Sequence, residues 1–506
     1  RSPLRQRGAI DGYGELAEPQ KGPTAKPTVN TRNLAMFFEP ESIAVIGVSA
    51  DLSRQNVARE IATLLHDLGR KQLYLVNPRG GAVAIGGVKY PLYKSLNDIP
   101  QPIDLAVYAA PAGSIAPFLS EAGERAKAAI IISGIPAGQD YAQFVRELDE
   151  IERSDLRVMG PNCMGVYSAP TATSAGINTL FIEGERLQIK GGKRANTALL
   201  TQSGALGLTA LDSLEESDIF QTVVSFGNQY DVKITDLVAH FAHDPGTALI
   251  SLYLEGFAPG EGRLFFELAE SIAKPILAYK AGRTEAGAKA AASHTAAMSG
   301  DYEVFRAACL QAGVVLAEEL EDFYHLLRIF ALLAGKKPRG LRAAGVVNAG
   351  FEAAVAGDAL HKLIPARLSE QTMAHLGSID PHGLINLSSP FIDVTPMADD
   401  QTFAAYVQAL LADENTDCVF VGIVPHSNAL KSVPRTCRDA DSLANRLVQL
   451  FAQSDKPLVA SVNGGRLYDP FAAIMKAGGI PVYGNIRAAI HSLNIYLAHF
   501  LKPTLR

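Results

Sequence analysis

A repeated alternation of short apolar runs with amphipathic segments constrains the fold of this chain more than any other feature. From Ser42 onward, β-branched runs end in Gly, Ser or Asn and lead into helix-like stretches, as in SIAVIGVSA (42–50), DLAVYAAP (104–111) and AAIIISGIP (128–136). Strands and helices that alternate in this way form parallel sheets covered by helices. Ligands of such sheets bind outside the carboxyl ends of the strands, where these turns lie.

The alternation falls into three series, which predicts an α/β protein of three domains behind a linker or tail. The first residues are rich in Pro, Gly, Lys and Gln and show no regular periodicity, as is typical of a linker. Gly- and Lys-rich turns separate the later series. The expected units are a linker or tail over 1–34, a Rossmann-like domain over 35–190, and two flavodoxin-like domains over 191–337 and 338–506.

Two strand–turn–helix stretches in the second and third series resemble each other. They read LLTQSGALGLTALDSL (199–214) and GVVNAGFEAAVAGDAL (345–360). The similarity favours two related flavodoxin-like units.

Composition excludes several classes of function. The formal net charge of −6 gives no basic footprint for nucleic acid or an anionic membrane. No run approaches the roughly 18–20 apolar residues that span a bilayer, and the first thirty residues lack a hydrophobic signal core. The four cysteines form no CxxC pair, which argues against a disulfide framework and against a zinc site. We therefore expect a soluble, cytoplasmic protein without a metal site of its own.

Two Gly- and Ser-containing turns are candidate phosphate sites. The segment GVSADLSR (47–54) lacks the three glycines of a dinucleotide fingerprint, yet it joins a strand to the start of a helix. A helix start presents free N–H groups and a positive dipole end, which suits a phosphate, although a plain strand–helix turn explains the segment equally well. In TQSGALG (201–207), Ser203 and Gly204 stand where a helix begins, and the small Ala205 leaves its N–H groups open.

One histidine stands in an unusual surrounding. His294 lies in KAGRTEAGAKAAASHTAAMSGDYEV (280–304), a stretch of small residues that offers it little to pack against. A surface histidine explains this position by itself. Together with Ser203 and Glu255 of the YLEG segment it also meets the needs of phosphohistidine chemistry: a neutral ring nitrogen to attack phosphorus, a carboxylate on the other nitrogen, and helix N-termini to hold the phosphoryl group.

The order of these motifs resembles a known family. FFEPESIAVIGVS, VNPRGG, DLAVYAAP, IISGIP, GPNCMGV, TQSGALG, YLEG and KAGRTEAGAKAAASHT follow one another as in the α subunit, or α part, of ADP-forming acetyl-CoA synthetases. The α subunit of succinyl-CoA synthetase is a more distant relative. Phe351 and Glu352 depart from the family pattern, which has Gly and Pro at these positions.

The resemblance implies roles for individual residues. It makes His294 the phosphorylated histidine and Glu255 its carboxylate partner, and it places Ser203, Gly204 and Ala205 on a helix N-terminus that grips the phosphoryl group. It assigns the first domain to CoA. The implied CoA-binding residues are Ser49, Ala50, Asp51, Ser53, Arg54, Asn77, Pro78, Arg79, Ala110, Pro111, Ser133, Gly134 and Ile135.

The resemblance also implies a reaction and its partners. Acyl-CoA, NDP and phosphate would be interconverted with a small carboxylic acid, CoA and NTP through an acyl phosphate and phosphohistidine. In the family, ATP or ADP with Mg²⁺ is bound by an ATP-grasp domain. The three series use the chain up to Leu501, so we expect that domain in a partner subunit or upstream of Arg1, within an oligomer.

Two other classes of function stay open. A non-catalytic CoA or acyl-CoA sensor with the same fold would have no use for the combination of His294, Glu255 and Ser203. An NAD-dependent oxidoreductase fits the first domain alone, but Asn77 stands where such enzymes carry an acidic residue.

Overall fold

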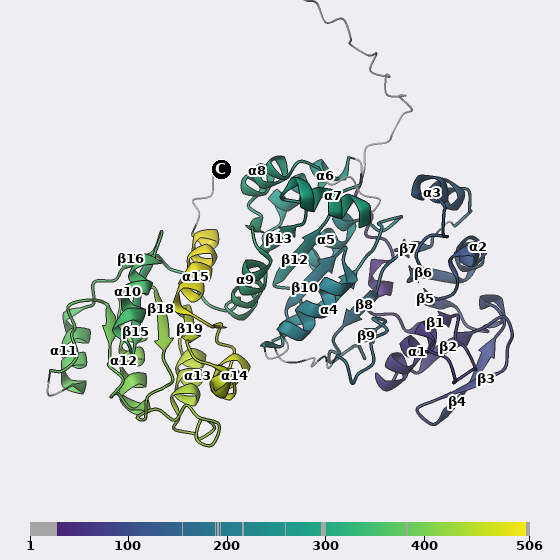
Figure 1. Cartoon of the computed structure of the whole chain (residues 1–506). Coiled ribbons are helices and arrows are strands. Elements are labelled where there is room, and N and C mark those ends of the chain that lie inside the picture. Colours follow the sequence, from purple (N-terminus) through teal and green to yellow (C-terminus); the bar gives the residue numbers. More distant parts are fainter. Residues whose placement is uncertain are drawn as a thin grey trace, which may run out of the picture.

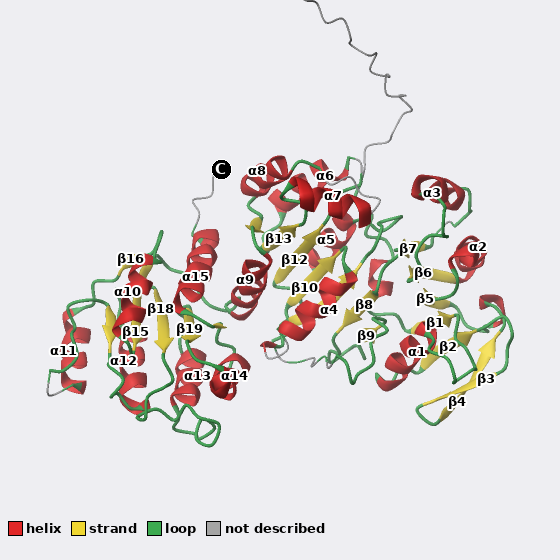
Figure 2. Ribbon diagram, viewed as in Figure 1, coloured by secondary structure: helices red, strands yellow, loops and turns green. Residues whose placement is uncertain are grey.

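The described residues form three α/β units, arranged in the order of the sequence in Figure 1. The structure is a computed structural model that describes residues 28–153, 155–187, 189, 192, 194–214, 217–258, 260–294, 300–380 and 383–501, with only the backbone of 292–294. Helices cover both faces of the sheets (Figure 2), so strands such as β1 and β10 are buried along their whole length.

The first sheet has the order β3-β4-β2-β1-β5-β6-β7, in which only the β3–β4 pair is antiparallel. The parallel part is the Rossmann-like strand order. Its elements are η1 (Leu34–Phe37), β1 (Ser42–Ile46), α1 (Val57–Asp67), β2 (Gln72–Val76), β3 (Ala82–Ile85), β4 (Val88–Tyr93), η2 (Leu96–Asp98), β5 (Ile103–Tyr108), η3 (Ala112–Ser114), α2 (Ile115–Arg125), β6 (Ala126–Ile131), α3 (Tyr141–Asp149) and β7 (Arg157–Met159).

The second sheet has the order β14-β13-β12-β10-β11-β8-β9. The run β11-β10-β12-β13-β14 is parallel and has the flavodoxin strand order. Its elements are β8 (Gly165–Ser168), β9 (Ile177–Asn178), β10 (Thr197–Thr201), α4 (Gly204–Ser213), β11 (Phe220–Ser225), α5 (Ile234–His243), β12 (Leu249–Leu254), α6 (Glu261–Ser271), β13 (Ile276–Lys280), α7 (Glu285–His294), α8 (Tyr302–Ala312), β14 (Val315–Ala317) and α9 (Leu320–Leu332).

The third sheet repeats the flavodoxin order as β16-β15-β18-β19-β20, and β17 also pairs with β15. The similar stretches at 199–214 and 345–360 therefore occupy equivalent places in their sheets. The elements are β15 (Arg342–Val347), α10 (Gly350–Asp358), β16 (Ile364–Pro365), α11 (Glu370–Ile379), β17 (Phe391–Asp393), α12 (Asp400–Ala412), β18 (Cys418–Ile423), α13 (Leu443–Gln453), β19 (Leu458–Val462), η5 (Arg466–Tyr468), α14 (Asp469–Ala477), β20 (Val482–Tyr483) and α15 (Ile486–Phe500).

The pairing of β8 concerns the expected limit between the first and second domains. β8 and β9 lie before the boundary expected at residue 190, yet β8 pairs antiparallel with β11 of the second sheet. Without β8, β11 would be an edge strand with unpaired backbone groups, and β8 satisfies them. Residues 1–27 of the expected tail lie outside the described part, whereas Leu34 at its end is fully buried. The limits themselves stay predictions.

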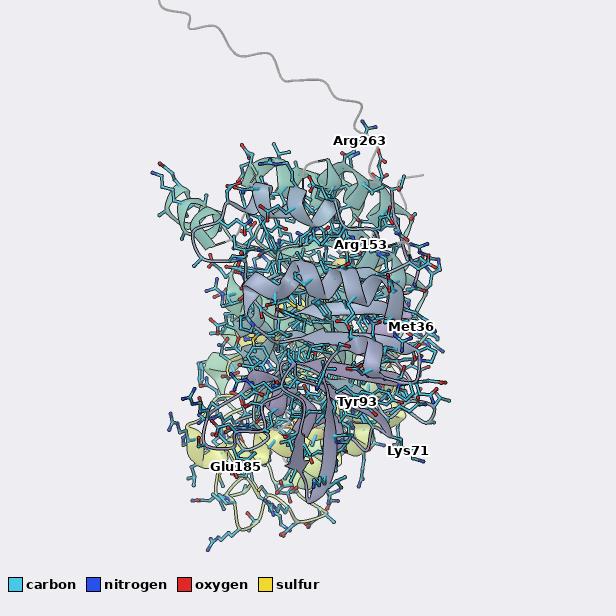
Figure 3. All side chains as sticks on the ribbon, turned by 90° about the vertical axis from the view of Figure 1, so that its right-hand side faces the viewer. Met36, Lys71, Tyr93, Arg153, Glu185 and Arg263 are labelled. Atoms are coloured by element: carbon cyan, nitrogen blue, oxygen red, sulfur yellow. The ribbon has the colours of Figure 1, made fainter. Side chains whose placement is uncertain are left out.

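A buried ion cluster joins the first and second units. Arg157 on β7 is 2% exposed and donates to the carboxylates of Asp231 (3.0 Å) and Asp236 (2.8 Å). The backbone N–H of Asn30 also donates to Asp236 (2.7 Å). Burial raises the pKa of Asp236. The hydrogen bonds that its carboxylate accepts and the positive charge of Arg157 oppose this rise. Nearby, the guanidinium of Arg153, labelled in Figure 3, lies 4.5 Å from the ring centre of Tyr230.

The second and third units share one apolar core cluster. α9 packs against α15, where the rings of Phe330 and Tyr496 lie 5.2 Å apart and the Tyr496 hydroxyl donates to the carbonyl of Leu333 (2.7 Å). Among the described residues, no helix has the length and apolar character needed to cross a membrane.

We expect the Arg157→Leu variant to lose about 3–5 kcal/mol of unfolding free energy, because it leaves buried carboxylates without their cation. Urea denaturation measures this loss. The control is Arg32→Ala, which removes an exposed pair with Asp155 and should change stability by less than about 1 kcal/mol. Equal effects of the two substitutions would contradict the role given to the cluster.

Candidate functional site

The first candidate site lies where the strand order of the first sheet reverses. β1 and β5 are neighbours there, and the loops that follow them diverge, which leaves a crevice. Gly47, directly after β1, has φ +101, and a Cβ on it would lie 2.6 Å from the carbonyl oxygen of Ala109. A cavity of about 520 Å³ opens at this place.

Five of the expected CoA residues line this cavity. Asn77 and Arg79 follow β2, where the Asn77 side chain donates to the carbonyl of Val48 (2.8 Å) and accepts from the backbone N–H of Arg79 (2.9 Å). These bonds hold the turn after β2 against the turn after β1. The five lining residues are Asn77, Pro78, Arg79, Ala110 and Pro111.

The segment from Ser49 to Arg54 forms a turn beside the cavity. Asp51 accepts from the backbone N–H (3.0 Å) and hydroxyl (2.6 Å) of Ser53, and these hydrogen bonds lower the pKa of Asp51. The Arg59 guanidinium donates to three carbonyls of the turn, those of Ser49, Asp51 and Arg54. The side chain of Arg54 is 85% exposed. Ser49, Ala50, Asp51, Ser53 and Arg54 are not among the described residues that line the cavity.

The segment from Ser133 to Ile135 follows β6, one strand further along the sheet. The Ser133 hydroxyl donates to the carbonyl of Ala110, and its own carbonyl accepts from the backbone N–H of Asn162 (2.9 Å). Ser133 thus holds Ala110, a residue of the cavity wall, without lining the cavity itself. Of the described residues that line the cavity, none belongs to this segment.

Sequence reasoning missed several residues of this cavity. Asn56 caps α1, and its side chain accepts from the backbone N–H groups of Ser49 (3.1 Å) and Arg59 (2.9 Å). An Asn at a helix start is a signal that the sequence offered. Lys94, Tyr108 and Glu121 also line the cavity. Lys94 stands in no recognisable motif, and only the pairing of β4 with β2 brings it to the same edge as Arg79.

The second candidate site lies at the equivalent place of the second sheet, between β10 and β12. Ser203 caps α4 and accepts from the backbone N–H of Leu206 (3.4 Å), as expected for a helix start. Gly204 is needed because a Cβ there would lie 2.2 Å from Cγ of Met164. The N-terminus of α4, including Ala205, therefore begins at the switch point of the sheet.

Gln202 connects the two strands at this switch point, and sequence reasoning missed it. Its side-chain N–H donates to the carbonyl of Gly256 (3.0 Å), and its side-chain oxygen accepts from the backbone N–H groups of Gly256 (3.1 Å) and Glu255. The side chain is buried, so these bonds are shielded from water. Gln202 thus fixes the turn of Glu255 against the start of α4, next to Ser203.

Glu255 is buried, at 6% exposure, directly after β12. Burial, and then the neighbouring Glu255 carboxylate, raise the pKa of Tyr253 to about 12. The structure brings Glu255 to the same switch point as Ser203, Gly204 and Ala205.

His294 is the last residue of α7. Its side chain lies outside the described part, as do residues 295–299, so its pairing with Glu255 stays a prediction. α7 follows β13, which lies beside β12 with Lys280 opposite Leu254. The helix that carries His294 therefore leaves the same edge of the sheet as Glu255.

The third unit repeats the strand order and the amide bridge of the second unit, but the side chains at its helix start differ. Asn348 bridges β15 and β18, since its side chain donates to (2.9 Å) and accepts from (2.8 Å) the backbone of Val424. The helix start that follows is different: Ala349 caps α10 without a side-chain hydrogen bond, and Glu352 lies fully buried with its carboxylate accepting from Asn463 (2.8 Å). A buried carboxylate in the first turn disfavours an anion at this helix end.

Comparisons with known proteins show which family the chain belongs to. Residues 41–169 match a family model described as a CoA binding domain, and residues 194–330 match one described as a succinyl-CoA ligase like flavodoxin domain. The alpha subunits of acetate–CoA ligase (ADP-forming) II and I from Pyrococcus furiosus are 30% and 31% identical; each match covers 91% of this chain, and 97% and 96% of the relatives. This chain belongs to the family of ADP-forming acetate–CoA ligase alpha subunits.

A solved structure supports the membership. Dinucleotide-forming acetyl-coenzyme A synthetase 1 of Candidatus Korarchaeum cryptofilum, in complex with phosphate and ADP, superposes with a TM-score of 0.78 at 27% identity. The match covers 92% of this chain and 96% of that chain. The predicted family and α/β fold class are confirmed, whereas the roles of individual site residues stay predictions.

We expect Gln202→Ala to lower the unfolding free energy by about 1–3 kcal/mol, because it leaves buried backbone groups of the Glu255 turn without partners. Thermal and urea unfolding measure the loss. Gln143→Ala is the control, since that side chain bonds Glu147 on an exposed helix face (3.1 Å). If both variants unfold like the unchanged protein, the bridge does not hold the turn.

Proposed function

We propose that this chain is the CoA-binding and phosphohistidine-bearing part of an NDP-forming acyl-CoA synthetase. The observation that carries the proposal is the Gln202 bridge, which holds the Glu255 turn against the N-terminus of α4 at the switch point of the second sheet. Family membership supports the reaction class, an acid–CoA ligase. The alpha-subunit relatives support a partner subunit; we propose that an ATP-grasp fold there binds ATP or ADP with Mg²⁺, and that the assembly works in the cytoplasm.

The first step forms an acyl phosphate. An oxygen of inorganic phosphate attacks the carbonyl carbon of acyl-CoA, the carbon–sulfur bond breaks, and the CoA thiolate leaves and takes a proton. The cavity at β1 and β5 holds the CoA, with Arg79 and Lys94 as the cations available for its phosphates. The N–H groups at the start of α4, beside Ser203, bind the phosphoryl oxygens.

The second and third steps pass the phosphoryl group through His294. A ring nitrogen attacks phosphorus, the bond between phosphorus and the acyl oxygen breaks, and the free carboxylate leaves. An oxygen of the NDP then attacks phosphorus and the phosphorus–nitrogen bond breaks, which yields NTP. Glu255 is a positioning residue in this scheme, because its carboxylate orients the ring and stabilises the positive charge that forms on it.

The CoA site is tested by Arg79→Ala and Lys94→Ala. We expect each to weaken CoA binding about tenfold, and the affinity of the unchanged chain to fall as salt rises, because the contacts are between charges. Isothermal calorimetry measures both effects. Arg487→Ala, an exposed arginine at the start of α15, is the matched control. Equal affinity for CoA and NAD would overturn the CoA site and favour an oxidoreductase.

The phosphoryl relay is tested with the chain alone. Given an acyl-CoA and ³²P-phosphate, it should form an acid-labile label at His294, since both steps use groups that we place on this chain. We expect no label in His294→Ala and a label reduced at least tenfold in Glu255→Gln, which loses the charge but keeps the shape. A folded chain that binds CoA but takes up no label from a broad panel of acyl-CoAs, with or without an ATP-grasp partner, would identify a sensor.

A further inference from the structure

A second cavity opens at the same edge of the second sheet, beside the Glu255 turn. It measures about 500 Å³ and lies between α6 and α8. Gly256, the residue after Glu255, lines one side, and Gly300 and Asp301 line another. Gly300 is the first described residue after the stretch that follows His294. The cavity therefore lies between the residues that follow Glu255 and the start of α8.

Three phenylalanines from three segments line this cavity. Phe257 follows the Glu255 turn, Phe266 lies on α6 and Phe305 on α8. Their ring centres are 5.7 Å apart for Phe266 and Phe305, 6.1 Å for Phe257 and Phe305, and 6.3 Å for Phe257 and Phe266. These are the spacings of tilted and edge-to-face aromatic contacts, which an added ring would extend.

The lining also carries charge. Lys280, at the end of β13, is 4% exposed, and its ammonium lies 6.0 Å from the centre of the Phe305 ring. Burial lowers the pKa of Lys280, and the Asp301 carboxylate opposes this shift. That carboxylate itself caps α8 by accepting from the backbone N–H groups of Glu303 (2.8 Å) and Val304 (3.1 Å). The cavity thus combines aromatic walls with a buried cation, which suits an anion with an apolar body.

We propose that this cavity binds the apolar body of the carboxylic acid, and that the acid carries an aryl ring or a hydrocarbon group of similar bulk. The identity of this ligand as the substrate rests on the proposed function. Ligand cavities of roughly 300–1,000 Å³ with apolar walls and few polar groups enclose molecules of this size. Acetate is only a few times larger than a water molecule, which occupies about 30 Å³, so it would leave most of the cavity wet.

Binding of 3-phenylpropanoate to the whole chain, measured by isothermal calorimetry, tests the site directly. We expect it to bind at least tenfold more tightly than acetate. Ala308 lies on α8 and lines the cavity, so Ala308→Phe should fill the space and weaken 3-phenylpropanoate binding at least tenfold. Ala307→Phe is the matched control, because Ala307 is an exposed neighbour on the same helix, and it should bind within twofold of the unchanged chain.

A second variant distinguishes a blocked cavity from a protein that has lost its fold. Val304 lines the cavity but is 68% exposed, so Val304→Trp narrows the opening without disturbing the core. It should also weaken 3-phenylpropanoate binding, with an unchanged melting temperature. Affinity for 3-phenylpropanoate that equals that for acetate, or that Val304→Trp and a folded Ala308→Phe leave unchanged, would overturn the proposal.

The phosphohistidine label separates this inference from the proposed function. If 3-phenylpropanoyl-CoA labels His294 better than acetyl-CoA does, and Ala308→Phe reverses the preference, the cavity selects the substrate. If acetyl-CoA labels His294 equally well and Ala308→Phe changes neither rate, the cavity inference fails while the relay stands. If no acyl-CoA produces a label but 3-phenylpropanoate still binds in an Ala308-dependent way, the relay fails and the cavity stands as a binding site.

Discussion

The burial of parallel strands on both faces is the constraint on which the candidate sites depend. Helices cover the sheets, so the carboxyl edges and the loops that follow them are where ligands can reach polar groups. Within each unit the strand order reverses once, between β1 and β5, between β10 and β12, and between β15 and β18. The cavity lined by Asn77 and Arg79 and the Glu255 turn lie at the first two of these places, which is why residues far apart in sequence meet there.

The second and third units share a strand order and an amide bridge but differ at the helix start that follows the first strand. An amide side chain bridges the central strands in both, Gln202 in one and Asn348 in the other. Both helices begin with a glycine, but the one beside Gln202 has a Ser cap, whereas the one beside Asn348 has Ala349 and the buried Glu352. The resemblance between the two stretches thus concerns the strand order and the amide bridge, whereas the side chains at the two helix starts differ.

Buried contacts hold the first unit to the second and the second unit to the third. Arg157 of β7 in the first unit bonds Asp231, which precedes α5 of the second unit, and Asp236 within α5. A buried cation of this kind is costly to leave without its partners, so the two units resist separation. The aromatic contact of Phe330 with Tyr496 does the same between the second and third units through an apolar core.

The sequence by itself determined the fold class and the family, because strand period, turn residues and motifs can be read from the chain without its tertiary structure. It also predicted Asn77, Arg79 and Pro111, which line the first cavity, and Ser203 and Glu255, which follow β10 and β12 at the second candidate site. Only the tertiary structure decided that Lys94 joins Arg79, that Gln202 bridges two strands, that β8 belongs to the second sheet, and that three phenylalanines enclose a cavity. These features arise from strand pairing and helix packing between distant segments, and no local pattern encodes them.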